Sequence, residues 1–161
     1  MDKKEVYLVE DSADYRFLVR NVFNKFLPNY HLRFFQGAQE LYQFLILQSA
    51  PEYKGRRPGV IILDLKLPAI DGYELLKLIR QTPDNEITQW KTVPVVILTA
   101  GCQDRDIEKC YKAGANSFMI KPIDIEELRH LLETICHYWI DYNQMPVAKQ
   151  SQTLRTEEAT E

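Results

Sequence analysis

The stretch Val60–Gly72, VIILDLKLPAIDG, begins with four consecutive apolar residues and places an aspartate, Asp64, directly after them. An apolar run of this length, bounded by loop residues, is typical of a strand buried on both faces of a parallel sheet. Pro68 and the pair Asp71-Gly72 would shape the following loop and start a helix. The stretch therefore predicts a strand–loop–helix unit with Asp64 at the carboxyl end of its strand.

The same pattern recurs along the chain. Short apolar runs end at polar residues in three further places: at the pair Glu10-Asp11, at Thr99 and at Lys121. Together with a less regular run that contains Arg33, the apolar runs predict strands over Glu5–Val9, His31–Phe35, Val60–Leu63, Val93–Leu98 and Ser117–Ile120. Because helical periodicity fills the segments between these runs, we expect a mostly parallel sheet with helices on both faces.

The predicted helices have recognisable ends. Ser12 is a suitable N-cap for the first helix, which Pro28 would stop, and Gly114 is a good left-handed terminator for the fourth. Further helices are expected over Ala38–Leu47, from Asp71 onward, over Asp104–Ala113 and over Ile125–Trp139. The chain then turns polar, so we expect one domain over residues 1–142 and a mobile tail over residues 143–161.

The composition is that of an ordinary globular protein: of 161 residues, 45% are hydrophobic and 27% are charged. A net charge of −3 gives no general attraction to nucleic acid or anionic lipid. No apolar run approaches the ~18 residues that cross a membrane. Cys102, Cys110 and Cys136 are odd in number and lack the pair spacing of a metal site. We therefore expect a cytoplasmic protein with reduced thiols and without nucleic-acid or membrane partners.

The polar residues that follow the strands should gather in one place, because the carboxyl ends of parallel strands share one edge of the sheet. Three carboxylates there, from Glu10, Asp11 and Asp64, would repel by roughly 4 kcal/mol per pair at ~4 Å with an effective dielectric of ~20. Such a cluster persists only if a cation or a shifted protonation relieves it. The hydroxyl of Thr99 and the ammonium of Lys121 beside it would suit a phosphoryl group.

Four motifs, in this order, carry a family resemblance: Val9-Glu10-Asp11, Leu63–Gly72, Leu98-Thr99-Ala100 and Gly114–Pro122. Over about Lys4–Tyr142 the chain resembles the receiver domain of two-component response regulators. The resemblance implies a flavodoxin-like, doubly wound (βα)5 fold with a five-stranded parallel sheet in the order 2-1-3-4-5. The long connections at 49–59 and 84–92 are also similar to those of the small regulators that accompany phytochrome-type kinases.

The resemblance implies a role for each residue at the sheet edge. Asp64 would be the phosphoacceptor, taking the phosphoryl group from a phosphohistidine. Asp11 and Asp64 would bind Mg²⁺ directly, with the main-chain carbonyl of Lys66 as a third ligand and Glu10 acting through water, a set that suits a hard octahedral ion. Lys121 would neutralise the transferred oxygens as charge develops.

Three further roles follow from the resemblance. Thr99 would hydrogen-bond the phosphoryl group, and Phe118 would turn inward as Thr99 moves. The peptide bond between Lys121 and Pro122 is expected to be cis, which costs only about 0.5–1 kcal/mol before proline. The Lys66 side chain would lie near the path of hydrolytic water, so we expect it to slow the loss of the phosphoryl group.

The implied function is a stand-alone, CheY-like phosphoacceptor that catalyses its own modification and turns over no external substrate. Its partners would be a sensor histidine kinase or phosphotransfer protein and a downstream protein. The output surface would be helix four, strand five and helix five, which can also form a homodimer. A pseudo-receiver that binds partners without phosphorylation remains the alternative.

Two other classes fit the sequence poorly. An aspartate-nucleophile phosphohydrolase needs a second acid two residues after the nucleophile, where this chain has Lys66. A flavodoxin must hold a phosphate in its first loop, and the acidic segment Asp11–Asp14 would repel that phosphate.

Overall fold

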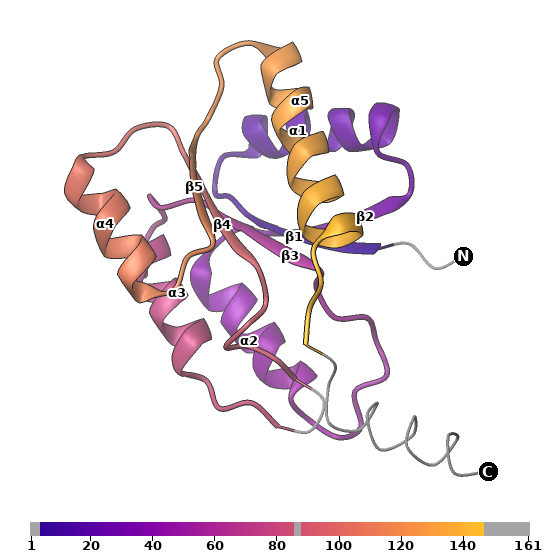
Figure 1. Cartoon of the computed structure of the whole chain (residues 1–161), viewed down its shortest axis with the longest axis vertical. Coiled ribbons are helices and arrows are strands. Elements are labelled where there is room, and N and C mark those ends of the chain that lie inside the picture. The colour runs from indigo at the N-terminus through magenta and orange to yellow at the C-terminus, as the bar shows by residue number, and fades with distance from the viewer. Residues whose placement is uncertain (1–3, 86–87, 147–161) are drawn as a thin grey trace.

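The structure is a computed structural model that describes residues 4–85 and 88–146 (Figure 1). Five parallel strands form one sheet in the order β2-β1-β3-β4-β5, which confirms the expected topology. The strands are β1 (Lys4–Val9), β2 (Tyr30–Phe35), β3 (Val60–Leu63), β4 (Val95–Thr99) and β5 (Ser117–Ile120). The helices are α1 (Ala13–Phe26), α2 (Ala38–Gln48), α3 (Gly72–Gln81), α4 (Asp104–Ala113) and α5 (Ile125–Cys136), and α5 continues as a π-helix, η1 (His137–Tyr142).

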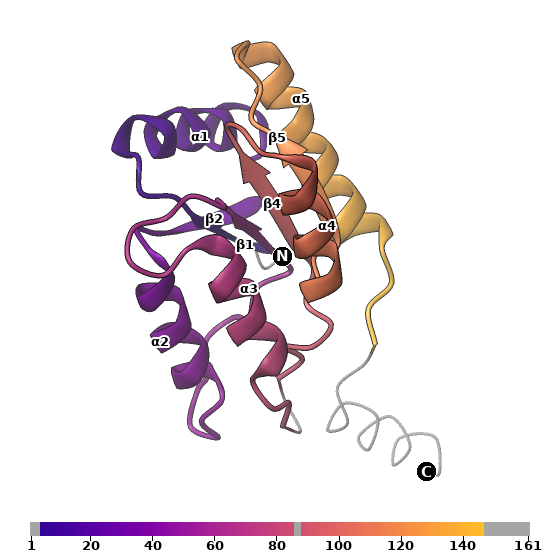
Figure 2. The ribbon, with the colours of Figure 1, turned by 90° about the vertical axis from the view of Figure 1, so that its left-hand side faces the viewer.

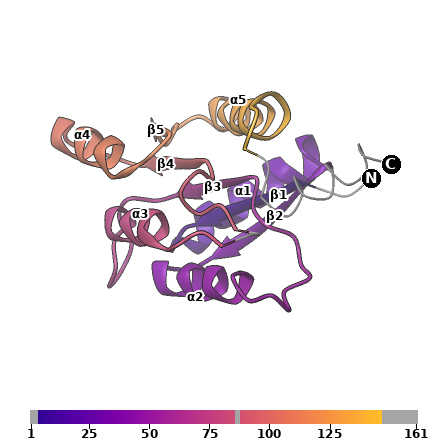
Figure 3. The same ribbon diagram turned by 60° about the horizontal axis from the view of Figure 1, so that its bottom comes forward.

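The sheet separates two hydrophobic cores because successive strand residues point to opposite faces. Ile61 and Leu63 of β3 face the core shared with α2 and α3, whereas Val60 and Ile62 face the core shared with α1 and α5. All four are fully buried, as expected for a strand covered on both faces. Figure 2 shows α2, α3 and α4 side by side, and Figure 3 shows α5 on the side of the sheet opposite α2 and α3.

The helix ends agree with the sequence signals. The Ser12 hydroxyl accepts a hydrogen bond from the Tyr15 amide at 3.3 Å, and the Asp71 carboxylate accepts one from the Glu74 amide at 2.9 Å. These side chains satisfy amides that the first turn of a helix leaves free. Gly114 ends α4 with a left-handed φ of 111°, a conformation that favours glycine.

Strand β4 begins two residues later than the apolar run predicts. The Val93 amide donates to the Gln89 carbonyl at 2.9 Å, and the Val93 carbonyl accepts from the Arg80 guanidinium at 2.7 Å. Both backbone groups of Val93 are therefore used in the loop, and pairing with β3 starts at the Pro94 carbonyl, which accepts from the Ile61 amide at 2.9 Å. Within this loop Trp90 is buried, and its indole nitrogen donates to Ser49.

The C-terminal helix is longer than predicted, because η1 carries it to Tyr142. Its Asp141 carboxylate binds both the Lys4 ammonium and the Tyr30 hydroxyl, which ties η1 to β1 and β2. Beyond η1, the Pro146 carbonyl accepts a hydrogen bond from the Gln89 side chain at 2.8 Å. Most of the predicted mobile tail lies outside the described residues, so that expectation stays a prediction.

Two expectations from composition can be compared with the structure. Cys102, Cys110 and Cys136 are free thiols. Within residues 4–85 and 88–146, no helix has the length and apolar character needed to cross a membrane.

Candidate functional site

The strand register brings the predicted site residues together at the carboxyl edge of the sheet. Val9 of β1 lies opposite Leu63 of β3, so Glu10 and Asp64, the residues that follow them, are neighbours. The backbone continues this alignment, because the Asp64 amide donates to the Val9 carbonyl at 3.1 Å. On the other side, the Lys121 amide donates to the carbonyl of Thr99 at 2.8 Å. Main-chain hydrogen bonds therefore hold the site residues in place.

The Lys121 ammonium lies among carboxylates. Its Nζ is 3.0 and 3.1 Å from the two carboxylate oxygens of Glu10 and 3.1 Å from Oδ2 of Asp64. The Lys121 side chain is 13% exposed, and those of Glu10 and Asp64 are 2% and 8% exposed. Because little water reaches them, these charges interact more strongly than surface ion pairs do.

One lysine does not balance the acidic cluster. Carboxylate oxygens of Glu10, Asp11 and Asp64 lie within 4.8 Å of one another. Burial, together with a hydrogen bond to Asp64, raises the pKa of Glu10 to about 7 against the opposing effect of Lys121. Burial lowers the pKa of Lys121, but its hydrogen bonds to Glu10 and Asp64 raise it by more, so the net shift is upward. A cluster of oxygen donors with excess negative charge fits a hard divalent cation.

The Thr99 hydroxyl has no partner among the described residues. Thr99 is fully buried, and its Oγ1 makes no hydrogen bond within residues 4–85 and 88–146. A buried hydroxyl without a partner costs about 1–3 kcal/mol. A ligand oxygen bound at this edge could satisfy it, since Thr99 ends β4 between the strands that precede Asp64 and Lys121.

Gly72 allows the loop after Asp64 to pack against the start of α3. A side-chain carbon built on Gly72 would clash with the Asp64 carbonyl and would stand 2.8 Å from the Leu65 Cα. The Gly72 amide also donates to the Leu65 carbonyl at 2.9 Å. The backbone role predicted for this glycine is therefore one of close approach, because its φ is not in the left-handed region.

Lys66 and Phe118 lie near the site with different surroundings. The Lys66 amide donates to Oδ1 of Asp64 at 3.2 Å, while its side chain is exposed and reaches toward the loop after β4. A side-chain carbon built on Gly101 would stand 3.9 Å from Lys66 Nζ. Phe118 is half-buried and packs against the core shared with α2 and α3, and its amide donates to the Tyr111 hydroxyl at 3.1 Å.

The expected cis bond is absent. No cis peptide occurs within residues 4–85 and 88–146, so the prediction for the bond between Lys121 and Pro122 is wrong for this structure. The trans form is the more stable one before proline, by about 0.5–1 kcal/mol. With it, Lys121 Nζ still reaches Glu10 and Asp64, so the ion pairs do not require the cis form.

Sequence reasoning missed two residues of the site, both in the first turns of α1. Lys121 Nζ lies 4.3 Å from the centroid of the Tyr15 ring. The Arg16 guanidinium donates to the main-chain carbonyl of Glu10 at 2.6 Å. The position of these residues in the sequence could have indicated their role. A helix whose N-cap, Ser12, directly follows Asp11 must place its first turn beside the site.

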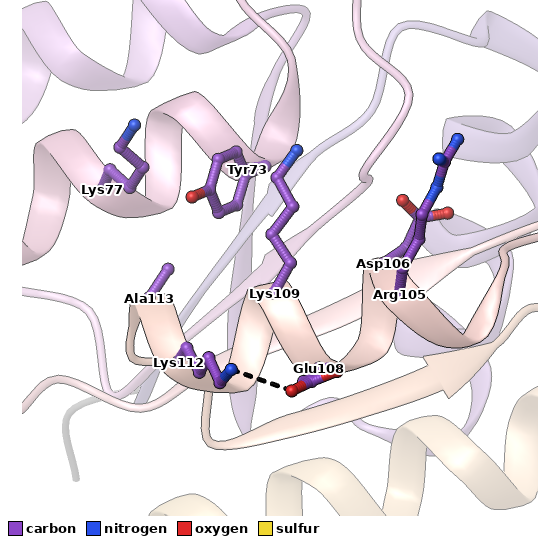
Figure 4. Close-up of a pocket in the computed structure, with 8 residues that line it drawn as sticks. All are labelled: Tyr73, Lys77, Arg105, Asp106, Glu108, Lys109, Lys112 and Ala113. Atoms are coloured by element: carbon purple, nitrogen blue, oxygen red, sulfur yellow. Dashed lines mark ion pairs between the residues drawn. The ribbon is translucent and has the colours of Figure 1, made fainter.

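A separate hollow of about 600 Å³ lies between α3 and α4, away from the acidic cluster. Figure 4 shows the Tyr73 ring between the side chains of Lys77 and Lys109, whose ammonium groups are 5.0 and 3.9 Å from its centroid. On α4, Lys112 pairs with Glu108 at 2.8 Å. Several charged side chains that line the hollow thus have local partners. None of the lining residues belongs to the acidic cluster at the sheet edge.

The doubly wound sheet thus carries three carboxylates, a buried threonine hydroxyl and a lysine at its carboxyl edge. The family model of the response regulator receiver domain matches residues 6–133. The chain therefore belongs to the response regulator receiver family of two-component signalling.

Single-domain response regulators are among its relatives. The chain is 33% identical to response regulator Rcp1 of Synechocystis over 90% of its own length and 95% of that protein. The Mn²⁺-bound structure of Rcp1 has a TM-score of 0.70 at 31% identity, with 89% and 99% of the two chains covered. The phosphorylated cyanobacterial phytochrome response regulator RcpA has a TM-score of 0.75 at 25% identity, with 90% and 99% covered.

A third solved structure bears on the metal. The receiver domain of sensor histidine kinase PA1611 from Pseudomonas aeruginosa has a magnesium ion in its active-site cleft. It has a TM-score of 0.65 at 25% identity, with 86% and 98% of the two chains covered. Structural neighbours thus hold Mn²⁺ or Mg²⁺, and the acidic cluster of this chain fits a divalent metal site.

Proposed function

We propose that this protein is a single-domain response regulator that accepts a phosphoryl group on Asp64. The observation that carries the proposal is the combination at one sheet edge of a buried aspartate, a lysine in contact with it and a buried threonine hydroxyl without a described partner. An incoming phosphoryl group would use all three. The functional unit is the domain over residues 1–142, and we assign no function to residues 143–161.

In the proposed reaction, a carboxylate oxygen of Asp64 attacks the phosphorus of a phosphohistidine on a histidine kinase or phosphotransfer protein. The new O–P bond gives an acylphosphate on Asp64, and the broken N–P bond leaves a free imidazole. Lys121 Nζ lies 3.1 Å from Asp64, which supports the proposal that it meets the oxygens of the transferred group. Positioning and electrostatics supply most of the catalysis in phosphoryl transfer.

Four groups would hold Mg²⁺: the carboxylates of Asp11 and Asp64, the main-chain carbonyl of Lys66, and Glu10 through water. The ion, when bound, supplies positive charge that offsets the negative charge of the transferring group. Lys121 Nζ lies 3.0 Å from Glu10 and 3.1 Å from Asp64, so both carboxylates would face the lysine as well as the ion. The chain would promote its own phosphorylation and dephosphorylation without turning over an external substrate.

The proposed output is a change at the surface formed by α4, β5 and α5. Thr99 would bond the phosphoryl group, and Phe118, now half-buried, would turn further inward. A ligand changes the populations of two conformations only as much as its binding free energies for them differ. A tenfold change in the population ratio needs a difference of about 1.4 kcal/mol. The surface would bind a downstream protein or a second copy of the chain. We place this activity in the cytoplasm, with a phytochrome-type kinase as one candidate donor.

The proposal is tested with acetyl phosphate and Mg²⁺, following phosphorylation by intact-protein mass spectrometry. Wild type should gain one phosphoryl group, and Asp64→Asn should gain none. Asp104→Asn makes the same chemical change at an exposed aspartate of α4 and should be labelled like wild type. Unchanged labelling of Asp64→Asn would contradict the proposal.

Beryllofluoride separates the proposal from a pseudo-receiver, which binds partners without phosphorylation. The analogue mimics a phosphoryl group on an aspartate and needs Mg²⁺ to do so. We expect it to perturb backbone NMR signals around Asp64 and Thr99 and to change the mass measured by light scattering if α4, β5 and α5 form a dimer. If neither acetyl phosphate nor beryllofluoride modifies Asp64, the pseudo-receiver interpretation holds.

A further inference from the structure

The aromatic ring of Tyr15 faces the ammonium group at the centre of the site. Lys121 Nζ lies 4.3 Å from the ring centroid, inside the ~6 Å range of a cation–π interaction. The Tyr15 side chain is half-buried and that of Lys121 is 13% exposed, so little water separates them. Cation–π contacts strengthen when the cation is desolvated in this way.

Local structure fixes the backbone that carries the ring at two points. The Ser12 cap accepts the Tyr15 amide, which places Tyr15 in the first turn of α1. The next residue, Arg16, donates to the Glu10 carbonyl at 2.6 Å and ties the start of α1 to the end of β1. The backbone position from which the ring reaches Lys121 is therefore set by contacts that do not involve the lysine itself.

The ring makes the contact, and the hydroxyl does not contribute to it. The Tyr15 hydroxyl oxygen is buried and has no hydrogen-bond partner within residues 4–85 and 88–146. Burial, followed by the charges of Glu10 and Asp64, raises the pKa of Tyr15, so the phenol stays neutral at physiological pH. Phenylalanine would thus preserve the interaction, since it keeps the ring and removes a hydroxyl without a described partner.

We propose that Tyr15 is a positioning residue that holds the Lys121 ammonium while its carboxylate partners change, an inference that rests on the proposed function. Glu10 and Asp64 bind Lys121 here, yet both are also candidate metal groups, and Asp64 is the proposed acceptor. When a metal or phosphoryl group engages them, their hold on Lys121 weakens. The face of the Tyr15 ring competes for neither group, so it keeps the ammonium aimed at the transferred oxygens.

The kinetic test compares two replacements of Tyr15. Tyr15→Leu removes the ring, and we expect acetyl phosphate to label Asp64 about tenfold more slowly. Tyr15→Phe restores the ring and should return the rate to within about twofold of wild type. The Mg²⁺ affinity, measured by calorimetry, should stay within about twofold in both variants, because Tyr15 contributes no metal ligand. A merely structural defect would lower the rate and the metal affinity together.

A spectroscopic test reads the contact without phosphorylation. A ring current from Tyr15 should shift the Lys121 side-chain NMR signals next to Nζ upfield in wild type and in Tyr15→Phe, and Tyr15→Leu should abolish the shift. The matched control is Tyr73→Leu, because the Lys109 ammonium lies 3.9 Å from that ring. This control should move the Lys109 signals, leave those of Lys121 in place and leave labelling unchanged.

The outcomes separate this inference from the proposed function. Unshifted Lys121 signals in wild type, or equal labelling rates of wild type and Tyr15→Leu, would overturn the role of the ring. A Tyr15→Phe variant as slow as Tyr15→Leu would overturn it too, because the hydroxyl would then be the active group. If Tyr15→Leu melts at a much lower temperature than wild type, Tyr15→Met replaces it under the same criteria. Failure of wild type to label at Asp64 would overturn the proposed function and with it the positioning role, whereas the NMR result decides the contact between Tyr15 and Lys121 independently.

Discussion

Two cations lie at opposite ends of strands β4 and β5, and their surroundings differ. At the amino ends, the Arg80 guanidinium donates to neutral oxygens of the described residues, namely the carbonyls of Gly114, Trp90 and Val93 and the side chain of Asn116, at 2.7–3.0 Å. At the carboxyl ends, the Lys121 ammonium is bound by the carboxylates of Glu10 and Asp64. Burial lowers the pKa of Arg80, whereas the net shift of the pKa of Lys121 is upward.

The comparison assigns Arg80 a role in stability and Lys121 a role in the proposed phosphorylation. The Arg80 guanidinium bonds the carbonyls of Trp90 and Val93 before β4 and that of Gly114 before β5, so this network connects the two loops. The carboxylates around Lys121 are the proposed acceptor, Asp64, and a proposed metal group, Glu10, so their contacts with the lysine would change in the proposed reaction. We therefore expect the loss of Arg80 to reduce stability and the loss of Lys121 to reduce phosphorylation.

The largest expected effect is that of Lys121→Met on phosphorylation. Removing a charge that meets the transferred oxygens typically costs about 100-fold or more in rate. The measurement is the initial rate of labelling by acetyl phosphate at saturating Mg²⁺. Lys109→Met, which removes a lysine that also lies over a tyrosine ring, is the control and should keep the wild-type rate. A Lys121→Met rate within threefold of wild type would remove the distinction between the two cations.

Arg80→Met tests the other half of the comparison. The change leaves several carbonyl oxygens without their donor, so we expect the free energy of unfolding to fall by about 3 kcal/mol. Urea unfolding followed by circular dichroism measures it, with Lys77→Met on the same helix as the control. The folded fraction should still label at the wild-type rate. Normal stability together with slow labelling would assign Arg80 to the reaction and not to the fold.

Thr99→Val sharpens the comparison, because it should change stability and function in opposite directions. Valine has nearly the shape of threonine and lacks the hydroxyl that has no described partner. Without ligands, we expect the free energy of unfolding to rise by about 1 kcal/mol, and the affinity for beryllofluoride to fall about fivefold. Thr99→Ser keeps the hydroxyl and should retain the affinity. A loss of stability in Thr99→Val would mean that the hydroxyl already has a partner, such as ordered water.

The smallest expected effect concerns Lys66, whose exposed side chain reaches toward Gly101 beside the site. If this cation shields the acylphosphate from water, Lys66→Ala should shorten its lifetime about threefold. A phosphate-release time course measures the decay, and Lys54→Ala in a remote loop is the control. Equal decay of wild type and Lys66→Ala would show that the side chain does not shield the phosphoryl group.

The sequence predicts the contacts at the carboxyl ends of the strands, around Lys121, better than those at the amino ends, around Arg80. Asp64 and Lys121 follow apolar runs directly, so strand position alone places them at one edge. The Arg80 network joins residues that are 10 to 36 positions apart along the chain, and no periodicity marks it. Hydrogen bonds from a guanidinium to neutral backbone carbonyls leave no signal in the composition either. The Arg80 hydrogen-bond network could therefore be recognised only from the folded structure.

Three other differences between the sequence predictions and the structure also depend on the folded arrangement or on small energy differences. Tyr15 was missed because a tyrosine in a helix normally indicates packing, and its contact with Lys121 depends on how α1 lies against the sheet. The trans bond before Pro122 depends on a preference of only about 0.5–1 kcal/mol, which a motif does not determine. The π-helix after Cys136 is associated with anchoring of Asp141 to β1 and β2, a long-range contact.

The most direct measurement traps the acylphosphate chemically. Borohydride reduction converts a phosphorylated aspartate to homoserine, which peptide mass spectrometry then locates in protein treated with acetyl phosphate. We predict homoserine at position 64 when Mg²⁺ is present and almost none after chelation of the metal. Homoserine at another aspartate, or at position 64 independently of divalent metal, would contradict the claim that the edge cluster is a metal-dependent phosphoacceptor site.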